Sequence, residues 1–338
     1  MTAFLAQYLP YTHTQAFSSI ATDYVAQAAA LQPFYEHAPT IEGIKNAIAQ
    51  RANVATNRSL LVAELKKQYE GFDLPTKLRA SIDSLLQDNS FTITTAHQPN
   101  IFTGHLYFIY KILHAIKLAE ALQTSLPGHQ FVPVYYMGSE DADLDELGAV
   151  SIDGKEYRWH TKQQGAVGRM KVDKEFIALI NEMEGQLSVE PHGAEILSIV
   201  RSAYTLGASI EQATFKLVHE LFGQFGLVVL LPDNAALKSQ MIPLIRKELQ
   251  EQFSSRVVNE TMAAFPESYK VQAAGREINL FYLKDDLRER IEKAGDGWMV
   301  VNTDLQFTHD EMLAALQQHP ERFSPNVILR PVYQELIL

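Results

Sequence analysis

Two histidines lie close to a Thr-Gly pair in the segment "TAHQPNIFTGHLY". His97 and His105 could bridge phosphate oxygens or polarise a transferring group. Thr103 and Gly104 at a helix start would leave backbone N–H groups free to meet an anion, and the glycine would permit close approach. In the simpler alternative, Thr103 is only the N-cap of the helix, and His97 satisfies a buried carbonyl. The residue types alone leave both interpretations open.

A second group of polar residues follows in "GSEDADLDE". Glu140, Asp141 and Asp143 could hold Mg²⁺ through water molecules. They could instead bind the ammonium group of a substrate, or form a solvated charge run at the start of the next helix. The segment follows an apolar, strand-like run directly, which favours a functional role.

Both segments lie where a parallel sheet would place a ligand. Strand-like runs cover residues 91–96, 131–138, 226–234 and 326–331, and a strongly periodic helical segment connects the first two. A strand, a long helix and a second strand predict a parallel pair with a right-handed crossover. Ligands of such sheets bind beyond the carboxyl ends of the strands. The later strands would add Asp233, Asn234, Arg330, Gln334 and Glu335 to this edge.

The rest of the chain predicts an α/β core with two insertions. Residues 1–90 contain four amphipathic helical segments separated by Pro, Gly or Asn. We assign 1–150, 221–258 and 325–338 to a discontinuous core, in which 1–90 is a helical lead-in. Residues 151–220 and 259–324 break the alternation of strand and helix, and we assign them to a first and a second insertion.

Composition excludes several classes of protein. The 338 residues carry a net charge of -11, which argues against nucleic acid or an anionic membrane as a partner. The absence of cysteine excludes disulfides, thiolate metal sites and a cysteine nucleophile, and makes the cytoplasm the default location. No apolar run approaches the roughly 20 residues that cross a bilayer. P-loop, G-x-G-x-x-G, G-x-S-x-G and H-E-x-x-H motifs are missing from the sequence.

The Gly-His pair at the helix start is similar to half of the H-x-G-H signature of nucleotidylyl transferases and class I aminoacyl-tRNA synthetases. A broader resemblance covers nearly the whole chain from about residue 15. The chain resembles the BshC family, the cysteine-adding enzymes of bacillithiol biosynthesis. The resemblance is carried by "TAHQPNIFTGHLYFIYKI", "VPVYYMGSEDADLDE", "GAVGRM", "YTLGASIEQATFKLVHELFGQFGLVVLLPDN", "VQAAGREINLFYL" and "FSPNVILRPVYQE", in the family's order.

The resemblance implies a Rossmann-like parallel sheet, similar to the class I synthetase and nucleotidylyl transferase folds, interrupted by two connecting-peptide insertions. It also implies a C-terminal coiled coil that mediates a homodimer; this segment is absent from the sequence, which we expect to be a fragment. The implied activity joins the carboxyl group of L-cysteine to the amine of glucosaminyl-malate, completing bacillithiol. ATP with Mg²⁺ is the expected activating reagent, although the sequence has no counterpart of the K-M-S-K-S motif.

We therefore predict an amide-forming ligase with His97 and His105 as catalytic residues and with no resident metal site. Many family members have Gly-Gln-Gln and Thr-Gly-Pro where this chain has Ala-His-Gln and Thr-Gly-His. The predicted substrate- or nucleotide-binding residues are Gln98, Thr103, Gly104, Lys111, Glu140, Asp141, Asp143, Arg330 and Glu335. Two alternatives remain: a nucleotidylyl transferase that adenylates another small acid, and a non-catalytic nucleotide- or metabolite-binding module.

Overall fold

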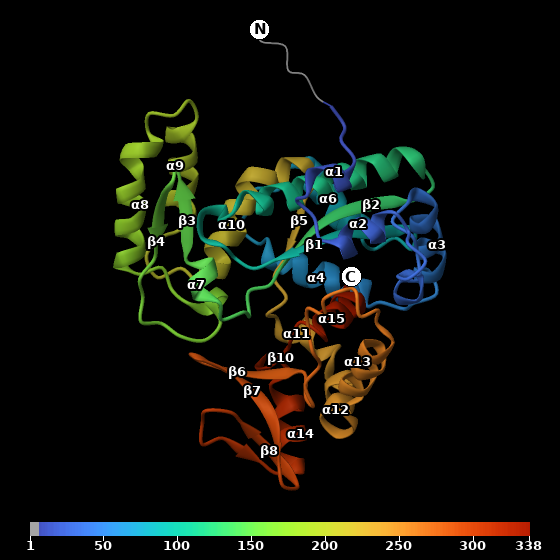
Figure 1. Cartoon of the computed structure of the whole chain (residues 1–338). Helices are drawn as coiled ribbons and strands as arrows, with labels where there is room; N and C mark the ends of the chain where they lie inside the picture. The colour runs from blue at the N-terminus through green and yellow to red at the C-terminus, as the bar shows by residue number, and fades with distance from the viewer. Residues whose placement is uncertain (1–6) are drawn as a thin grey trace.

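The computed structural model describes residues 7–338, which fold around a small parallel sheet (Figure 1). Its strand order is β1-β2-β5, with β1 at Ser90–His97, β2 at Gln130–Met137 and β5 at Val228–Leu230. Both strand pairs are parallel, and the full length of β1 pairs with β2 from Ser90 opposite Gln130 to His97 opposite Met137. The predicted parallel α/β core is confirmed.

The connection from β1 to β2 is the long helix α6, Leu106–Ser125. Its buried face packs on the sheet and carries Phe108, Ile112, Ala115, Ile116, Ala119 and Leu122. This spacing keeps apolar side chains on one side of a 3.6-residue helix. The β1–α6–β2 unit therefore places the end of β1, the start of α6 and the end of β2 at one edge of the sheet.

The N-terminal part is helical, as predicted, and its segment around Gln68 and Tyr69 supports the sheet from the β5 side. The side chain of Gln68 donates to the Val229 carbonyl at 2.8 Å and accepts from Leu231 N–H at 3.0 Å, while Tyr69 accepts from Val229 N–H. These contacts satisfy the outer edge of β5, which is buried. The helices are α1 (Tyr11–Thr14), α2 (Ser19–Val25), α3 (Ile41–Arg51), α4 (Arg58–Gln68), α5 (Thr76–Ser84) and the 3₁₀ turn η1 (Gln32–Phe34).

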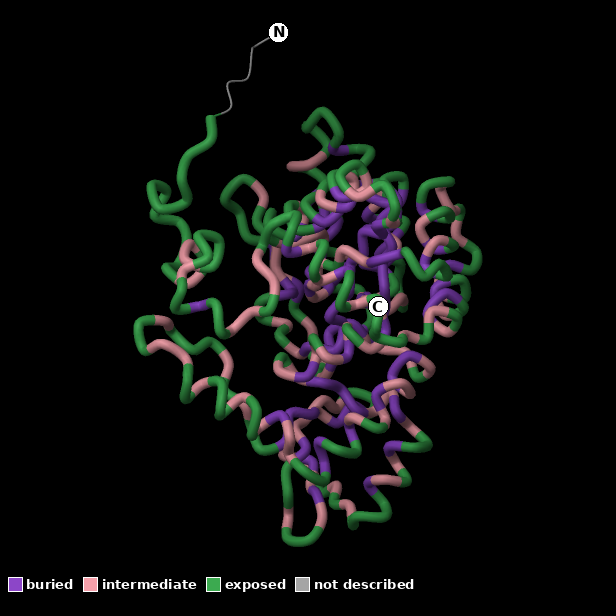
Figure 2. Tube along the Cα trace, turned by 90° about the vertical axis from the view of Figure 1, so that its right-hand side faces the viewer, coloured by how far each residue is buried: buried purple, intermediate pink, exposed green. Residues whose placement is uncertain are grey.

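Between β2 and β5 the chain forms a first block with its own apolar core, on the left of Figure 1. Trp159, Phe176 and Tyr204 are buried in it, and Figure 2 shows buried residues gathered in the interior of the fold with exposed residues around them. The elements are α7 (Leu144–Leu147), the antiparallel pair β3 (Ala149–Ile152) and β4 (Lys155–Arg158), η3 (Val167–Arg169), α8 (Lys174–Leu187), α9 (Gly193–Ala203), α10 (Ile210–Phe222) and η4 (Gly223–Phe225).

After β5 the chain forms a second block below the sheet in Figure 1. Three helices follow the sheet directly: α11 (Ala235–Ser239), α12 (Ile242–Glu251) and α13 (Phe253–Ala264). An antiparallel sheet in the order β10-β6-β7-β8-β9 comes next. Its strands are β6 (Leu280–Lys284), β7 (Leu287–Ala294), β8 (Gly297–Val300), β9 (Gln306–Phe307) and β10 (Phe323–Pro325), with α14 (His309–Gln318) and η5 (Pro320–Arg322) between the last two.

The predicted fourth core strand at 326–331 is wrong. The segment is a turn that leads into helix α15, Arg330–Ile337, with a proline in its first turn. Proline is favoured there because its missing N–H would have no partner within the helix. Asn326 holds the turn, since its side chain donates to Asn279 Oδ1 at 2.8 Å and accepts from Ile328 N–H at 2.9 Å. Arg330 therefore reaches the sheet edge from a helix start.

Candidate functional site

The loop after β1 does not form the predicted anion cradle. Residues Ile101–Thr103 make a 3₁₀ turn, and the N-cap of α6 is His105, so Thr103 is not the helix cap. Gly104 has φ +55° and ψ −130°, and its N–H already donates to the Ile101 carbonyl at 2.8 Å. An added Cβ would lie 2.6 Å from the side chain of Asn100. Gly104 is thus required by a tight turn and by contact with Asn100.

His97, at the end of β1, is only 8% exposed. Its Nδ1 accepts from the backbone N–H of Gln98 at 2.8 Å, and Nε2 is buried without a partner among the described residues. Burial, together with the charge of Lys111, lowers the pKa of His97 to about 4. Nδ1 also lies 2.9 Å from Oε1 of the Gln98 side chain, so its neighbours include both a donor and an acceptor and do not select one tautomer. His97 is therefore an uncharged imidazole at neutral pH.

The two predicted catalytic histidines both stack on the ring of Tyr107. Tyr107 stacks on His97 with ring centroids 5.1 Å apart, and on His105 with centroids 5.6 Å apart. Both pairs are nearly parallel, at 16° and 10°. His105 is exposed, whereas His97 is buried.

A cavity of about 260 Å³ opens at the carboxyl ends of β1 and β2. Two cations reach it from different elements: Lys111 from α6 and Arg330 from the start of α15. Lys111 Nζ donates to the Ala96 carbonyl at 2.6 Å, which fixes the ammonium at the cavity wall. The lining consists of Ala96, His97, Gln98, Tyr107, Lys111, Tyr136, Gly138 and Arg330. We call it the edge pocket; its cations and donors suit an anionic group.

The acidic loop after β2 lies beneath the edge pocket, but its carboxylates face the protein's own cations. Asp141 is buried, and its Oδ1 accepts from Arg330 Nη2 at 2.6 Å and from Arg288 Nη2 at 3.0 Å. Its backbone carbonyl accepts from Val167 N–H at 2.8 Å, so the "GAVGRM" segment also packs against this loop. We therefore revise the expected substrate-binding role of Asp141 to one of holding two arginines.

Glu140 belongs to a separate buried ion cluster. It pairs with Lys238 of α11, whose ammonium also donates to Asp233 at 3.2 Å. Arg169 of η3 makes a two-point contact with Asp233 at 2.6 and 2.9 Å. Burial alone would lower the pKa of Lys238, but Glu140 and Asp233 raise it above its ordinary value. Because its carboxylate is occupied by an internal ammonium, Glu140 is not open to a substrate ammonium or to Mg²⁺.

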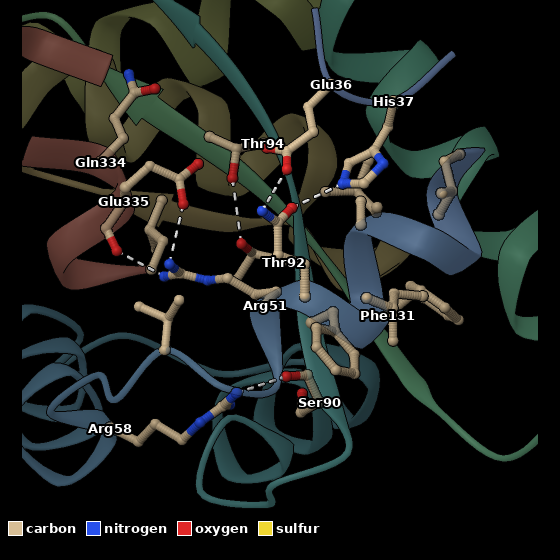
Figure 3. A pocket seen from close by; sticks show the side chains of 18 residues that line it. Glu36, His37, Arg51, Arg58, Ser90, Thr92, Thr94, Phe131, Gln334 and Glu335 are labelled. Carbon is tan, nitrogen blue, oxygen red and sulfur yellow. Dashed lines mark hydrogen bonds and ion pairs between the residues drawn. The ribbon is translucent and has the colours of Figure 1, made fainter. Parts of the chain in front are cut away.

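Asp143 and Glu335 complete the predicted set, and both lie outside the edge pocket. Asp143 is exposed at the start of α7, where its side chain makes no capping hydrogen bond. Glu335 pairs with Arg51 at 3.0 Å across a second cavity of about 630 Å³ along the outer edge of β1 (Figure 3). Of the predicted residues, the edge pocket thus gathers His97, Gln98, Lys111 and Arg330.

Several residues of the site were missed from the sequence. Lys238 and Arg288 are the buried partners of the acidic loop, and Tyr107 and Tyr136 are walls of the edge pocket. Glu211, at the start of α10, was also missed, and burial, followed by nearby Asp233, raises its pKa to about 8. Only the tyrosines lay in segments already identified as strand ends or helix starts.

Within residues 7–338, no helix is both long and apolar enough to cross a membrane. Over the same residues, no three side chains of the metal-binding types converge closely enough to hold a metal ion.

Comparison with known proteins places the chain in one family. The family model described as "Bacillithiol biosynthesis BshC, N-terminal Rossmann-like domain" matches residues 5–338. A protein from Cytophaga hutchinsonii is 40% identical over all of this chain and 63% of its own length; one from Flavobacterium johnsoniae is 39% identical over 98% of this chain and 62% of its own. A Salinibacter ruber protein is 31% identical over 96% of this chain and 61% of its own.

All three proteins carry the name "Putative cysteine ligase BshC". The chain spans less than two thirds of the length of these relatives.

Proposed function

Because this chain belongs to the BshC family of bacillithiol biosynthesis, we propose that it takes part in joining L-cysteine to the amine of glucosaminyl-malate. The names of the relatives support a cysteine ligase. The observation that carries the proposal is the edge pocket, in which Lys111 and Arg330 converge on a small cavity at the sheet edge where ligands of parallel α/β folds bind. In this proposal the insertions expected at 151–220 and 259–324 lie within the first and the second block.

The edge pocket fits one small anionic group. Its volume of about 260 Å³ lies below the roughly 300–1,000 Å³ of pockets for drug-sized ligands. We assign the malate carboxylates of glucosaminyl-malate to it, with Lys111 and Arg330 as counter-charges. The ring of His97 forms part of the pocket wall and, in this proposal, helps to orient the bound carboxylate.

The role proposed for His97 follows from its low pKa. A pKa of about 4 makes the imidazole a weak base at neutral pH. We therefore assign His97 a binding and orienting role and leave the deprotonation of the substrate amine to another group. An amide forms from a free carboxylate only after activation, and ATP with Mg²⁺ is the activating reagent in this proposal.

The decisive experiment incubates the purified protein with L-cysteine, glucosaminyl-malate and ATP–Mg²⁺ and detects products by mass spectrometry. We expect a product whose mass equals the sum of cysteine and glucosaminyl-malate minus one water. Omission of each reactant in turn is the control. Arg330→Gln should abolish the product, whereas Arg322→Gln, outside the edge pocket, should keep it.

Other outcomes would point to the alternative functions. A stable adenylate without an amide product favours a nucleotidylyl transferase. Binding of glucosaminyl-malate without any reaction favours a metabolite-binding module. A folded protein that neither binds glucosaminyl-malate nor forms the thiol product contradicts the proposal.

A further inference from the structure

The second block contributes a positive charge close to the edge pocket. Arg288 carries this charge but does not line the cavity. We propose that Arg288 of β7 is a positioning residue: by sharing Asp141 with Arg330, it leaves the positive charge of Arg330 available to an anionic ligand. The inference rests on the anion-binding role proposed for the edge pocket. It assigns to the second block a contribution to ligand affinity that the pocket lining alone does not reveal.

The two terminal nitrogens of the Arg330 guanidinium make different contacts. Nη2 donates to Asp141 Oδ1 at 2.6 Å, below the pocket floor. Nη1 faces Gly138, where an added Cβ would lie 3.7 Å from it, and Gly138 lines the edge pocket. One nitrogen therefore anchors the side chain, and the other is directed toward the cavity.

Arg288 depends on the same carboxylate oxygen. Its Nη2 donates to Asp141 Oδ1 at 3.0 Å, and its Cζ lies 3.8 Å from the centre of the Phe281 ring. Its Nε is buried and has no hydrogen-bond partner among the described residues. The side chain is 11% exposed, so water screens its charge weakly. Asp141 is thus the one carboxylate that Arg288 contacts in the described part of the chain.

The two buried clusters differ in net charge. The cluster with the excess positive charge is the one that includes Arg330 of the edge pocket. Around Glu140, the carboxylates of Glu140 and Asp233 face two cations, Lys238 and Arg169, and the charges balance, because nearby Glu211, with a pKa of about 8, is protonated at pH 7. Around Asp141, one carboxylate faces two guanidinium groups, which leaves one positive charge in excess. Without Arg288, Asp141 would neutralise Arg330, and an anion in the edge pocket would meet a neutral pair.

The test measures binding of L-malate at pH 7 by calorimetry. Arg288→Gln should weaken binding by about tenfold or more, because one nearby charge is lost in a poorly screened site. The double variant Asp141→Asn/Arg288→Gln restores a single excess charge on Arg330 and should bind within about threefold of the wild type. Arg290→Gln, on the same strand and paired with Glu292, is the matched control and should bind as the wild type.

The double variant separates charge from structure. If Arg288 only braces the fold, removal of Asp141 as well will weaken binding further, and the proposal is overturned. Unchanged binding in Arg288→Gln, or no binding of L-malate to the wild type, overturns it too. Should Arg288→Gln fail to fold, Arg288→Met, which keeps an apolar stem over Phe281, replaces it in both variants. Malate binding that follows this charge pattern without any thiol product would refute the ligase function alone.

Discussion

The backbone N–H of Gln98 donates to Nδ1 of His97 at 2.8 Å, at the point where β1 ends. Burial and the charge of Lys111, together with this donor, keep the imidazole neutral. A residue that the sequence indicated as a proton-transfer catalyst is therefore a weak base in the wall of the edge pocket.

Protein stability should therefore depend on the protonation of His97. Its pKa is about 4 in the folded chain, against the ordinary value of 6.5 for a histidine in an unfolded chain. The unfolded chain binds the extra proton between these values, so stability is complete above pH 6.5 and falls as the pH drops toward 4. The loss amounts to at most about 3 kcal/mol. Denaturant unfolding at several pH values should give a weaker pH dependence for His97→Gln than for the wild type.

His13→Gln is the control for this measurement, because His13 is exposed in α1. It should leave the pH profile unchanged. Parallel pH profiles for wild type and His97→Gln would show that the neutral state of His97 is not maintained by the fold.

Gly138→Ala should impair ligand binding without impairing folding. The new methyl group would lie 3.6 Å from Gln98 and 3.7 Å from Arg330, which are ordinary contact distances, and the backbone there is not left-handed. We expect the free energy of unfolding to change by less than about 0.5 kcal/mol. Binding of L-malate should weaken by about tenfold, since the methyl group occupies the edge pocket. Calorimetry combined with thermal unfolding distinguishes the two effects; equal affinity would show that the ligand lies elsewhere.

Gly104→Ala should have the opposite profile. Its φ of +55° with ψ −130° is unfavourable for any other residue, and the new Cβ would collide with Asn100. We expect a destabilisation of about 1–3 kcal/mol in denaturant unfolding. Gly128→Ala is the matched control, because nothing lies within 4 Å of its added Cβ. If both variants are equally stable, the turn before α6 does not require glycine.

Lys238→Ala should be strongly destabilising because it leaves Glu140 buried without a cation. Removal of one partner of a buried ion pair typically costs about 3–5 kcal/mol. Lys155→Ala, which breaks the exposed pair with Glu182, should change stability little. Chemical denaturation of both variants provides the comparison. A small effect for Lys238→Ala would mean that Glu140 takes up a proton and remains in place.

The core was predictable because each of its strands carries its own apolar signal. The runs at 131–138 and 226–234 are short, apolar and bounded by turn residues, and the periodic helix between the first two strands fixes a parallel pair. The run at 326–331 is also short and apolar, but it does not form a strand. Its apolar residues lead into a helix start, and Val327 is 61% exposed. Short apolar runs do not distinguish these cases.

The partners of the acidic loop were not predictable, because they are far away along the chain. Asp141 meets Arg288 and Arg330 only after the second block has folded back onto the sheet edge. A single sequence shows which carboxylates follow a strand, but it does not show which cations will reach them. Glu140 and Asp141 therefore looked open to ligands, and the fold pairs both of them internally.

The same separation has a consequence for how the protein is made. Asp141 leaves the ribosome 147 residues before Arg288 and 189 residues before Arg330. At a synthesis rate of about 5–20 residues per second, roughly ten to forty seconds pass before the counter-charge of its carboxylate has been synthesised. The edge of the β1–α6–β2 unit therefore carries an unpaired carboxylate during this interval, and the anion site forms only when α15 supplies Arg330.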